Sequence, residues 1–158
     1  CAKLLSFPKK AEKICKSLSK KIKKNFKKFD LILAPAMGGI IIGYEIGRLL
    51  NKETIFCERV KSKFRLRRGF NIRKGSKVLI VEDVITTGKS SLECSKLALN
   101  NKANIVGYAC LIDRSNGKSL IKGKIVSQVE LNIPTYTEKN LPNNLLALKA
   151  VKPGSRNL

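Results

Sequence analysis

The chain has 158 residues, 43% of them hydrophobic, which is enough for one domain with a buried core and too apolar for a disordered chain. The 33 lysines and arginines against 11 acidic residues give a net charge of +22, which favours anionic partners without choosing among nucleic acid, membrane surface and phosphorylated small molecules. No apolar run is long enough to span a membrane, and the five scattered cysteines lack a C-x-x-C pair, which argues against a disulfide framework or zinc site and indicates reduced thiols in the cytoplasm.

The first residues predict a lysine-rich helix. The chain opens on Cys1 rather than Met, so we expect a piece of a longer protein or a missing N-terminus. From Pro8 onward, apolar residues recur every three or four positions between Ala11 and Phe26, and ten lysines between residues 9 and 28 lie mostly off that stripe. Such a helix can bind a membrane surface or nucleic acid, or it can pack its stripe on a core with its lysines in water; we favour the second interpretation.

Strands and helices alternate through the rest of the chain. Short apolar segments predict strands at residues 30–34, 54–57, 77–81, 104–112 and 125–131. Helices are expected at 40–50, 90–100 and 141–148, with loops at 36–39 and 83–89 and a strongly basic segment at 58–74 that we interpret as a mobile loop or a hairpin. This alternation implies right-handed crossovers, so we expect a single α/β domain over 1–158, with a mostly parallel sheet flanked by helices.

The segment from Val78 to Ser90 carries the clearest chemistry. Four apolar residues form a buried strand, and Glu82 and Asp83 follow at its carboxyl end, where parallel sheets bind ligands. Two adjacent buried carboxylates are costly unless something uses them, and the paired hydroxyls of a sugar are natural users, with or without magnesium. Residues 86–90 are small or polar and lead into a helix, so their N–H groups and hydroxyls form a cradle for a phosphate. Together these features predict a ribose 5-phosphate site and phosphoribosyl pyrophosphate as the ligand.

A P-loop for nucleoside triphosphates is the main competing interpretation, because Gly88 is followed by Lys89 and Ser90. That motif needs a glycine five positions before its Gly-Lys pair, and Asp83 occupies this position. An ordinary structural turn, the other alternative, would not need two carboxylates together with five small or polar residues. The ribose 5-phosphate interpretation is therefore preferred to both.

Residues 82–90 resemble the motif of type I phosphoribosyltransferases, most closely of the branch that uses orotate. The match runs over nearly the whole chain: residues 34–40 resemble the family's pyrophosphate loop, and 66–70, 111–115 and 151–156 resemble one bacterial branch. The resemblance implies a transferase that joins orotate to phosphoribosyl pyrophosphate, giving orotidine 5′-phosphate and pyrophosphate in pyrimidine synthesis. Its magnesium ion would be held mainly through the substrate's pyrophosphate and ribose hydroxyls, without a metal site made by the protein alone.

The resemblance also assigns roles to residues. Glu82 and Asp83 would hold the ribose hydroxyls, with Asp83 in a catalytic role, and Thr86 would contact orotate as well as the phosphate. The implied phosphoribosyl pyrophosphate site is made of Glu82, Asp83, Val84, Ile85, Thr86, Thr87, Gly88, Lys89 and Ser90, and the implied pyrophosphate loop of Ala36, Met37, Gly38 and Gly39.

Arg114 is the residue that the resemblance places on the base. Its guanidinium would pair with the orotate carboxylate, where a charged hydrogen bond contributes on the order of 1.5–3 kcal/mol. The alternative is a surface ion pair with Asp113 or Glu130. The predicted place of Arg114, at the end of a strand on the ligand side, favours orotate.

The basic segment acquires a role through the same resemblance. Displacing pyrophosphate builds up charge on the leaving group, so mobile cations that close over it stabilise the transition state and exclude water. Arg59 and Lys63 match the positions that the family uses for this purpose. In the family the loop reaches into the partner's site, which implies a homodimer in which residues 59–73 cross to the other copy.

Three departures from the family pattern stand out. The chain has no histidine, although the family usually has one in the loop near Arg65, and Gly38 stands where many members have a lysine. The family's N-terminal hood, with a Ser-Gly-x-His-Ser strand that closes over orotate, would precede Cys1. The chain would then carry the phosphoribosyl half of the site and an incomplete base half.

Two other functions stay open at this point. One is transfer to a purine or another base, and the other is a non-catalytic regulator that senses phosphoribosyl pyrophosphate and binds nucleic acid. The charge of +22 motivates the regulator, which would bind in a salt-sensitive and sequence-selective way. Because the sequence has no recognisable module that reads DNA or RNA, we expect small-molecule substrates, no specific nucleic-acid partner and no membrane partner.

Overall fold

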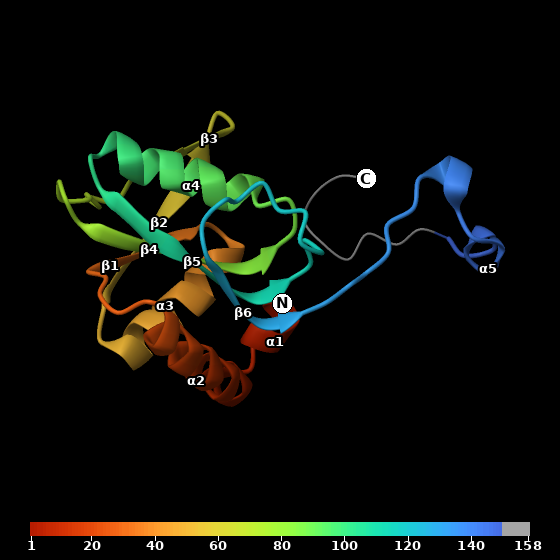
Figure 1. The fold of residues 1–158 in the computed structure, drawn as a ribbon, viewed down its shortest axis with the longest axis horizontal. Helices are drawn as coiled ribbons and strands as arrows, with labels where there is room; N and C mark the ends of the chain where they lie inside the picture. The colour runs from red at the N-terminus through yellow and green to blue at the C-terminus, as the bar shows by residue number, and fades with distance from the viewer. Residues whose placement is uncertain (150–158) are drawn as a thin grey trace.

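A computed structural model describes residues 1–149 as one six-stranded sheet with helices on both faces (Figure 1). The strand order is β3-β2-β1-β4-β5-β6, and all neighbours pair in parallel except β2 and β3. This confirms the predicted α/β class with a mostly parallel sheet. The strands are β1 (Leu31–Pro35), β2 (Glu53–Val60), β3 (Lys63–Arg65), β4 (Lys77–Ile85), β5 (Asn104–Asp113) and β6 (Ile125–Glu130). The helices are α1 (Ala2–Leu5), α2 (Pro8–Asn25), α3 (Gly38–Leu50), α4 (Lys89–Asn100), the 3₁₀ turn η1 (Glu138–Asn140) and α5 (Asn143–Leu146).

The central strands bury both of their faces. Ile32 and Leu79 belong to an apolar cluster that also contains side chains of α1, α2 and α3. Leu33 and Ile80, one position further along each strand, belong to a second cluster with side chains of α4. Consecutive residues of a strand point to opposite faces, so a continuous apolar run is what a sheet covered on both sides requires. Figure 1 shows α2 and α3 on one side of the sheet and α4 on the other.

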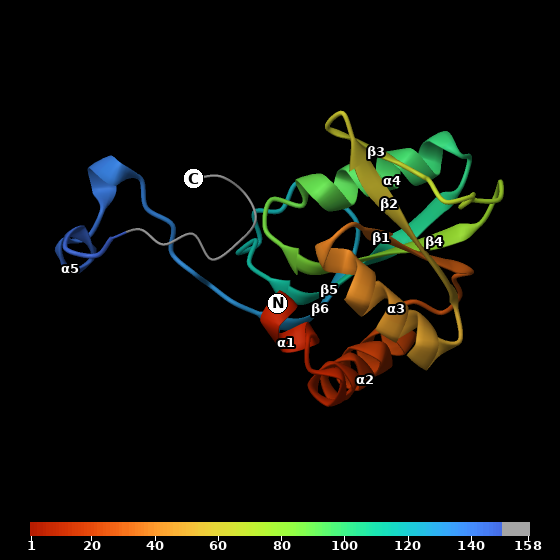
Figure 2. The same ribbon diagram turned by 180° about the vertical axis from the view of Figure 1, so that it is seen from behind.

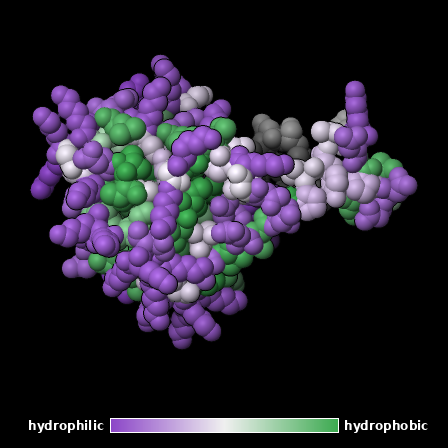
Figure 3. All heavy atoms as spheres, in the orientation of Figure 1, coloured by the Kyte–Doolittle hydropathy of each residue, from purple (hydrophilic) through white to green (hydrophobic). Residues whose placement is uncertain are grey.

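The lysine-rich helix α2 packs as the preferred interpretation expected. Cys15, Leu18 and Ile22 of its stripe are completely buried and Ile14 is partly buried, while its lysines are exposed. Lys21 reaches the edge of the sheet, where its Nζ donates to the backbone carbonyls of Ser127 and Gln128 at 3.0 and 2.9 Å. In Figure 3, hydrophilic side chains dominate the visible face of the body.

The structure corrects several expected boundaries near the site. Strand β4 continues to Ile85, because its pairing with β5 extends to Asp113, whereas a loop was expected from Asp83. Helix α3 begins at Gly38 and α4 at Lys89, so each takes in residues that were predicted as loop. The basic segment forms a hairpin of β2 and β3 through residue 65, which adds a sixth strand to the five that were predicted.

After β6 the chain leaves the body of the domain, and both ribbon views show residues 131–149 extending away from it (Figures 1 and 2). The helix expected at 141–148 is only Asn143–Leu146. Residues 151–156, which resemble one bacterial branch, lie outside the described residues, so the single domain over 1–158 stays a prediction. Among residues 1–149, no helix is both long and apolar enough to cross a membrane.

Candidate active site

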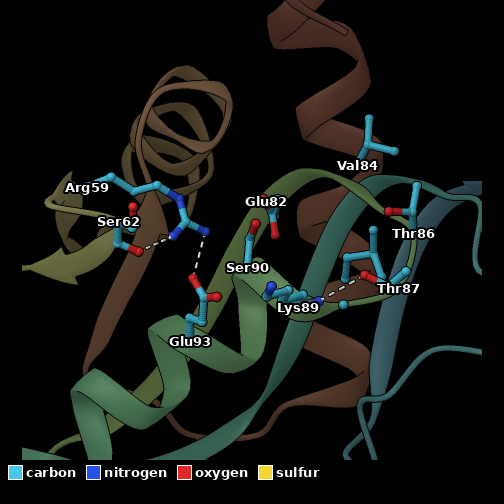
Figure 4. A pocket seen from close by; sticks show the side chains of 11 residues that line it. Arg59, Ser62, Glu82, Val84, Thr86, Thr87, Lys89, Ser90 and Glu93 are labelled. Atoms are coloured by element: carbon cyan, nitrogen blue, oxygen red, sulfur yellow. Dashed lines mark hydrogen bonds and ion pairs between the residues drawn. The ribbon is translucent and has the colours of Figure 1, made fainter. Parts of the chain in front are cut away.

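A polar cavity of about 450 Å³ opens at the carboxyl end of β4, between the β2–β3 hairpin and the start of α4 (Figure 4). Its size is in the range that binds small metabolites. Both signs of charge line it, because it contains two cations and two carboxylates. The lining residues are Arg59, Ser62, Glu82, Val84, Ile85, Thr86, Thr87, Gly88, Lys89, Ser90 and Glu93. Eight of the nine residues predicted to hold phosphoribosyl pyrophosphate therefore meet in one cavity, and Asp83 is the exception.

Glu82 and Asp83 lie on opposite faces of β4 because the strand continues past them. Glu82 faces α4, where the hydroxyl of Ser91 donates to its Oε2 at 2.5 Å. Asp83 faces α3: a Cβ placed on Gly38 would lie 2.7 Å from Asp83 Oδ1. The backbone N–H of Val84 also donates to this Oδ1, at 2.9 Å. The two carboxylates thus straddle the strand end, so a ligand must lie across β4 to contact both.

The turn at residues 86–90, here called the phosphate turn, is fixed by its backbone. Gly88 has φ +79°, a left-handed conformation that favours glycine, and it directly precedes α4. A Cβ at Gly88 would lie 2.7 Å from both Ile121 and Ser119, which fill the space behind the turn. The carbonyl of Thr87 accepts a hydrogen bond from the N–H of Leu120 at 2.9 Å. The segment around residues 119–121 thus supports the turn. The N–H of Lys89, the first of α4, donates to Thr87 Oγ1 at 3.4 Å, and the N–H groups of a helix's first turn lack acceptors within the helix, so they can bind an anion.

The predicted pyrophosphate loop lies beside Asp83 and not within the cavity. Ala36 is fixed by a 2.8 Å hydrogen bond from its N–H to the carbonyl of Cys57, and the Ala36–Met37 peptide bond is cis. Gly38 and Gly39 form the first turn of α3, so the loop is shorter than expected. A side chain at Gly38 would collide with the Asp83 carboxylate where it now lies.

Arg59 enters the cavity from β2 and is held on three sides. Its Nη2 lies 2.6 Å from Glu93 Oε2, and its Nη1 donates to the backbone carbonyl of Ser62 at 2.9 Å (Figure 4). The guanidinium also stacks on Phe64, 4.1 Å from the ring centroid. Lys63, the second predicted loop cation, lines a neighbouring cavity of about 440 Å³ instead. The structure therefore brings Arg59, and not Lys63, to the phosphate turn of its own chain.

Arg114 follows the last residue of β5 and lies next to the end of β4. Its backbone N–H donates to the carbonyl of Ile85 at 2.8 Å, and its side chain is exposed. No carboxylate within residues 1–149 forms an ion pair with its guanidinium, so the predicted alternative of a surface pair with Asp113 or Glu130 is not found there. Arg114 does not line the cavity, but it lies at the same edge of the sheet.

Two lining residues were missed by the sequence interpretation, Ser62 and Glu93. Glu93 follows Lys89 by four positions on α4, so helical spacing alone places it on the same face as the phosphate turn. The backbone carbonyl of Ser62 accepts a hydrogen bond from Arg59. Because every residue has a backbone carbonyl, the side chain of a serine gives no indication of this contact.

A pair of buried thiols lies behind the cavity. Cys57 on β2 and Cys94 on α4 are completely buried, with their Sγ atoms 3.1 Å apart. The hydrogen bond with Cys57 and burial raise the pKa of the Cys94 thiol well above its ordinary value. The Cys94 thiol therefore remains neutral, and the two side chains pack the hairpin strand against the helix.

Comparison with known proteins agrees with this geometry. The family model described as "Phosphoribosyl transferase domain" matches residues 8–139. A curated relative named orotate phosphoribosyltransferase, from Parvibaculum lavamentivorans, is 44% identical over 96% of this chain and 78% of its own length. The crystal structure of orotate phosphoribosyltransferase from Aeropyrum pernix superposes with a TM-score of 0.69 at 20% identity, covering 83% of this chain and 77% of that one. Adenine phosphoribosyltransferase from Saccharomyces cerevisiae reaches 0.70 at 20% identity, with 80% and 82% covered, so likeness of fold does not distinguish the base.

The mostly parallel sheet and the match of the family model to residues 8–139 define a phosphoribosyl-transferring enzyme. The chain belongs to the phosphoribosyl transferase domain family, and within it to the group whose curated members carry the name orotate phosphoribosyltransferase.

Proposed function

We propose that this protein transfers the phosphoribosyl group of phosphoribosyl pyrophosphate to orotate, forming orotidine 5′-phosphate and pyrophosphate in pyrimidine synthesis in the cytoplasm. The observation that carries the proposal is the union of Glu82, the phosphate turn and Arg59 around one cavity. The identity of the base rests on the relatives named orotate phosphoribosyltransferase and on Arg114 beside the strand end.

Each part of the site has a task in this reaction. The phosphate turn binds the 5-phosphate through backbone N–H groups and the hydroxyls of Thr86, Thr87 and Ser90. The ribose lies across the end of β4, so that Glu82 contacts it from one face and Asp83 from the other. A ring nitrogen of orotate attacks the anomeric carbon as the bond to pyrophosphate breaks, and its N–H proton is released to water. The guanidinium of Arg59 stabilises the charge that develops on the leaving group. Arg114 holds the orotate carboxylate, so the ring is oriented before the bond forms.

Magnesium fits this site as an ion carried by the substrate. Among residues 1–149 there is no group of three or more possible protein ligands in one place. Mg²⁺ commonly binds through one or two carboxylates together with substrate phosphates and water, and Glu82 and Asp83 supply carboxylates next to the predicted ribose hydroxyls. When bound, the ion neutralises charge on the pyrophosphate.

The assay follows orotate absorbance after the protein is mixed with phosphoribosyl pyrophosphate and magnesium. We expect absorbance to fall with time and pyrophosphate to appear in equal amount. Adenine, hypoxanthine and uracil serve as competing acceptors in parallel reactions. Turnover of one of these bases with no consumption of orotate would overturn the orotate assignment while leaving the phosphoribosyl site intact.

We also propose a homodimer in which the predicted crossing segment, residues 59–73, reaches the partner's site from Lys63 onward, while Arg59 at its base stays in the cavity of its own chain. Its support is an exposed apolar stripe on the first turns of α3, where Met37, Ile41 and Tyr44 are 82%, 48% and 66% exposed. An exposed apolar stripe of this kind, on a helix whose opposite side is buried against the sheet, is typical of a protein interface. Lys63, which is turned away from the cavity of its own chain, is the loop cation best placed to act on a partner.

Mixing two inactive variants tests this crossing. In a mixture of Lys63→Ala and Asp83→Asn chains, a loop acting on the partner leaves one intact site in each mixed dimer, and about a quarter of the wild-type activity should return. No recovery in a mixture that contains mixed dimers would show that Lys63 acts within its own chain or not at all.

A further inference from the structure

The carboxylate of Glu93 lies in a cavity proposed to bind a highly anionic substrate, where its charge opposes binding. It is one of only two carboxylates among the residues that line this cavity. The other, Glu82, has a proposed task on the ribose hydroxyls. Glu93 has no such task, so its place in the cavity needs another explanation.

The contact of Glu93 with Arg59 supplies this explanation. Their side chains are 32% and 40% exposed, and a pair with so much access to water contributes little to folding. The pair does fix a direction, because Glu93 binds one end of the guanidinium at 2.6 Å while the carbonyl of Ser62 accepts from the other end at 2.9 Å. Stacking on Phe64 fixes the plane of the group. A long, flexible side chain is thereby held in one orientation before any ligand arrives.

A guanidinium has five N–H donors. One donor on Nη1 is used in the hydrogen bond to Ser62, whereas the contact of Nη2 with Glu93 is an ion pair without hydrogen-bond geometry. The remaining donors of Arg59 can therefore meet phosphate oxygens without breaking the clamp. We propose that Glu93 is a positioning residue, which holds Arg59 over the phosphate turn so that its free donors are aligned with the departing pyrophosphate. This inference rests on the proposed function, since it deepens the role of Arg59 in that reaction.

Glu58 provides a matched control on the same hairpin. It pairs with Arg68 at 2.8 Å and with Arg67 at 3.8 Å, so it also links a carboxylate to arginine side chains. It does not line the cavity, and within residues 1–149 it forms no hydrogen bond or ion pair with Arg59. Removing the charge of Glu58 therefore perturbs the hairpin without releasing Arg59.

The test compares Glu93→Gln, Glu93→Asp, Glu58→Gln and Arg59→Ala, together with the double variant that combines Glu93→Gln and Arg59→Ala. Releasing a pre-oriented group typically costs one to two orders of magnitude, so we expect Glu93→Gln to lower kcat about ten-fold with little change in KM for orotate. Glu93→Asp keeps the charge and should recover part of the loss, while Glu58→Gln should stay close to wild type. In the absence of Arg59, Glu93→Gln should cause no further loss, because it acts only through that side chain.

Two results would overturn the proposal: wild-type kcat in Glu93→Gln, or an equal loss from Glu93→Gln with and without Arg59, which is the behaviour of a merely structural residue. The affinity for pyrophosphate, measured by calorimetry on the same set, gives a readout that does not depend on orotate. If the wild type fails to use orotate, the proposed function falls, and the calorimetric series still decides this inference. The inference is supported if Glu93→Gln weakens pyrophosphate binding when Arg59 is present and has no effect when Arg59 is replaced by alanine. Unchanged or tighter binding in Glu93→Gln contradicts it.

Discussion

The phosphate turn and the β2–β3 hairpin face each other across the cavity, and they are stabilised in different ways. The turn is fixed by its backbone: Gly88 adopts a left-handed conformation with Ile121 packed against it, and a main-chain hydrogen bond joins Thr87 to Leu120. Arg59, the hairpin residue proposed to act on the leaving pyrophosphate, is fixed by contacts of its side chain with Glu93, Phe64 and the carbonyl of Ser62. We call the turn the rigid half, because its main chain fixes it, and the hairpin the adjustable half, because single substitutions can remove the contacts that orient Arg59.

The largest expected effect comes from breaking the turn. Gly88→Ala places a Cβ against Ile121 and Ser119 and forces a left-handed conformation on alanine, which costs about 1–2 kcal/mol for the conformation alone. Displacing the turn by even a fraction of an ångström misaligns the phosphate, so we expect kcat/KM for phosphoribosyl pyrophosphate to fall about a hundred-fold. Steady-state kinetics measures the loss of kcat/KM, and thermal unfolding measures the loss of stability.

Gly75, in the turn before β4 and outside residues 59–73, is the control for this change. It has φ +81°, close to that of Gly88, but nothing lies within 4 Å of a Cβ placed there. Gly75→Ala should show the conformational cost in its unfolding temperature and little loss of turnover. An equal loss of activity in both variants would mean that the packing behind the turn is unimportant.

A smaller effect is expected from Arg114, which is anchored to the rigid half by its backbone hydrogen bond to Ile85. Arg114→Ala should raise KM for orotate about ten- to a hundred-fold, the loss of one charged hydrogen bond of about 1.5–3 kcal/mol. Affinity for phosphoribosyl pyrophosphate should change little. If both substrates weaken together, Arg114 supports the site as a whole and does not recognise the base.

The stability of the adjustable half should depend on pH through the carboxyl group of Glu58. The hydrogen bond from Arg68 holds the pKa of this carboxyl below its ordinary value of 4.5, and the charge of Arg67 acts in the same direction. Because the pKa of Glu58 is lower in the folded protein than in the unfolded chain, its contribution to the free energy of unfolding is complete above pH 4.5. This contribution is lost as the pH falls through the lowered pKa of the folded state. Unfolding midpoints of wild type and Glu58→Gln should therefore differ modestly near pH 7 and converge in acid. A difference that grows in acid would contradict the pairing.

The smallest expected effect concerns the reactivity of the five cysteine thiols. Burial raises the pKa of Cys110 to about 12 and that of Cys15 to about 11, and Cys57 and Cys94 are completely buried. Only Cys1 is partly exposed. Mass spectrometry after brief alkylation should find label on Cys1 and on the others only after unfolding. Rapid labelling of Cys94 would show that the hairpin opens away from α4.

The two halves also differ in how far the sequence predicted them. That residues 86–90 lie together in the cavity was predicted residue by residue, because small and hydroxyl-bearing residues after an apolar strand are recognisable in the local sequence. The strand before them was predicted to end at residue 81, four residues before its end in the structure. The opposite orientations of Glu82 and Asp83 were not predicted, since they depend on how far the pairing of β4 with β5 extends. The clamp on Arg59 was missed for a related reason: Glu93 is distant in sequence, and only the packing of α4 beside the hairpin brings the two together.

The most direct test of the phosphate turn as a ribose 5-phosphate site is a titration of the isotope-labelled protein with ribose 5-phosphate, followed by backbone amide resonances. We expect saturable shifts concentrated at residues 86–90, with the same titration of Gly88→Ala leaving these resonances unmoved. Shifts confined to the lysines of α2, appearing equally with inorganic phosphate and vanishing at moderate salt, would show a polycation attracting anions and would contradict the account.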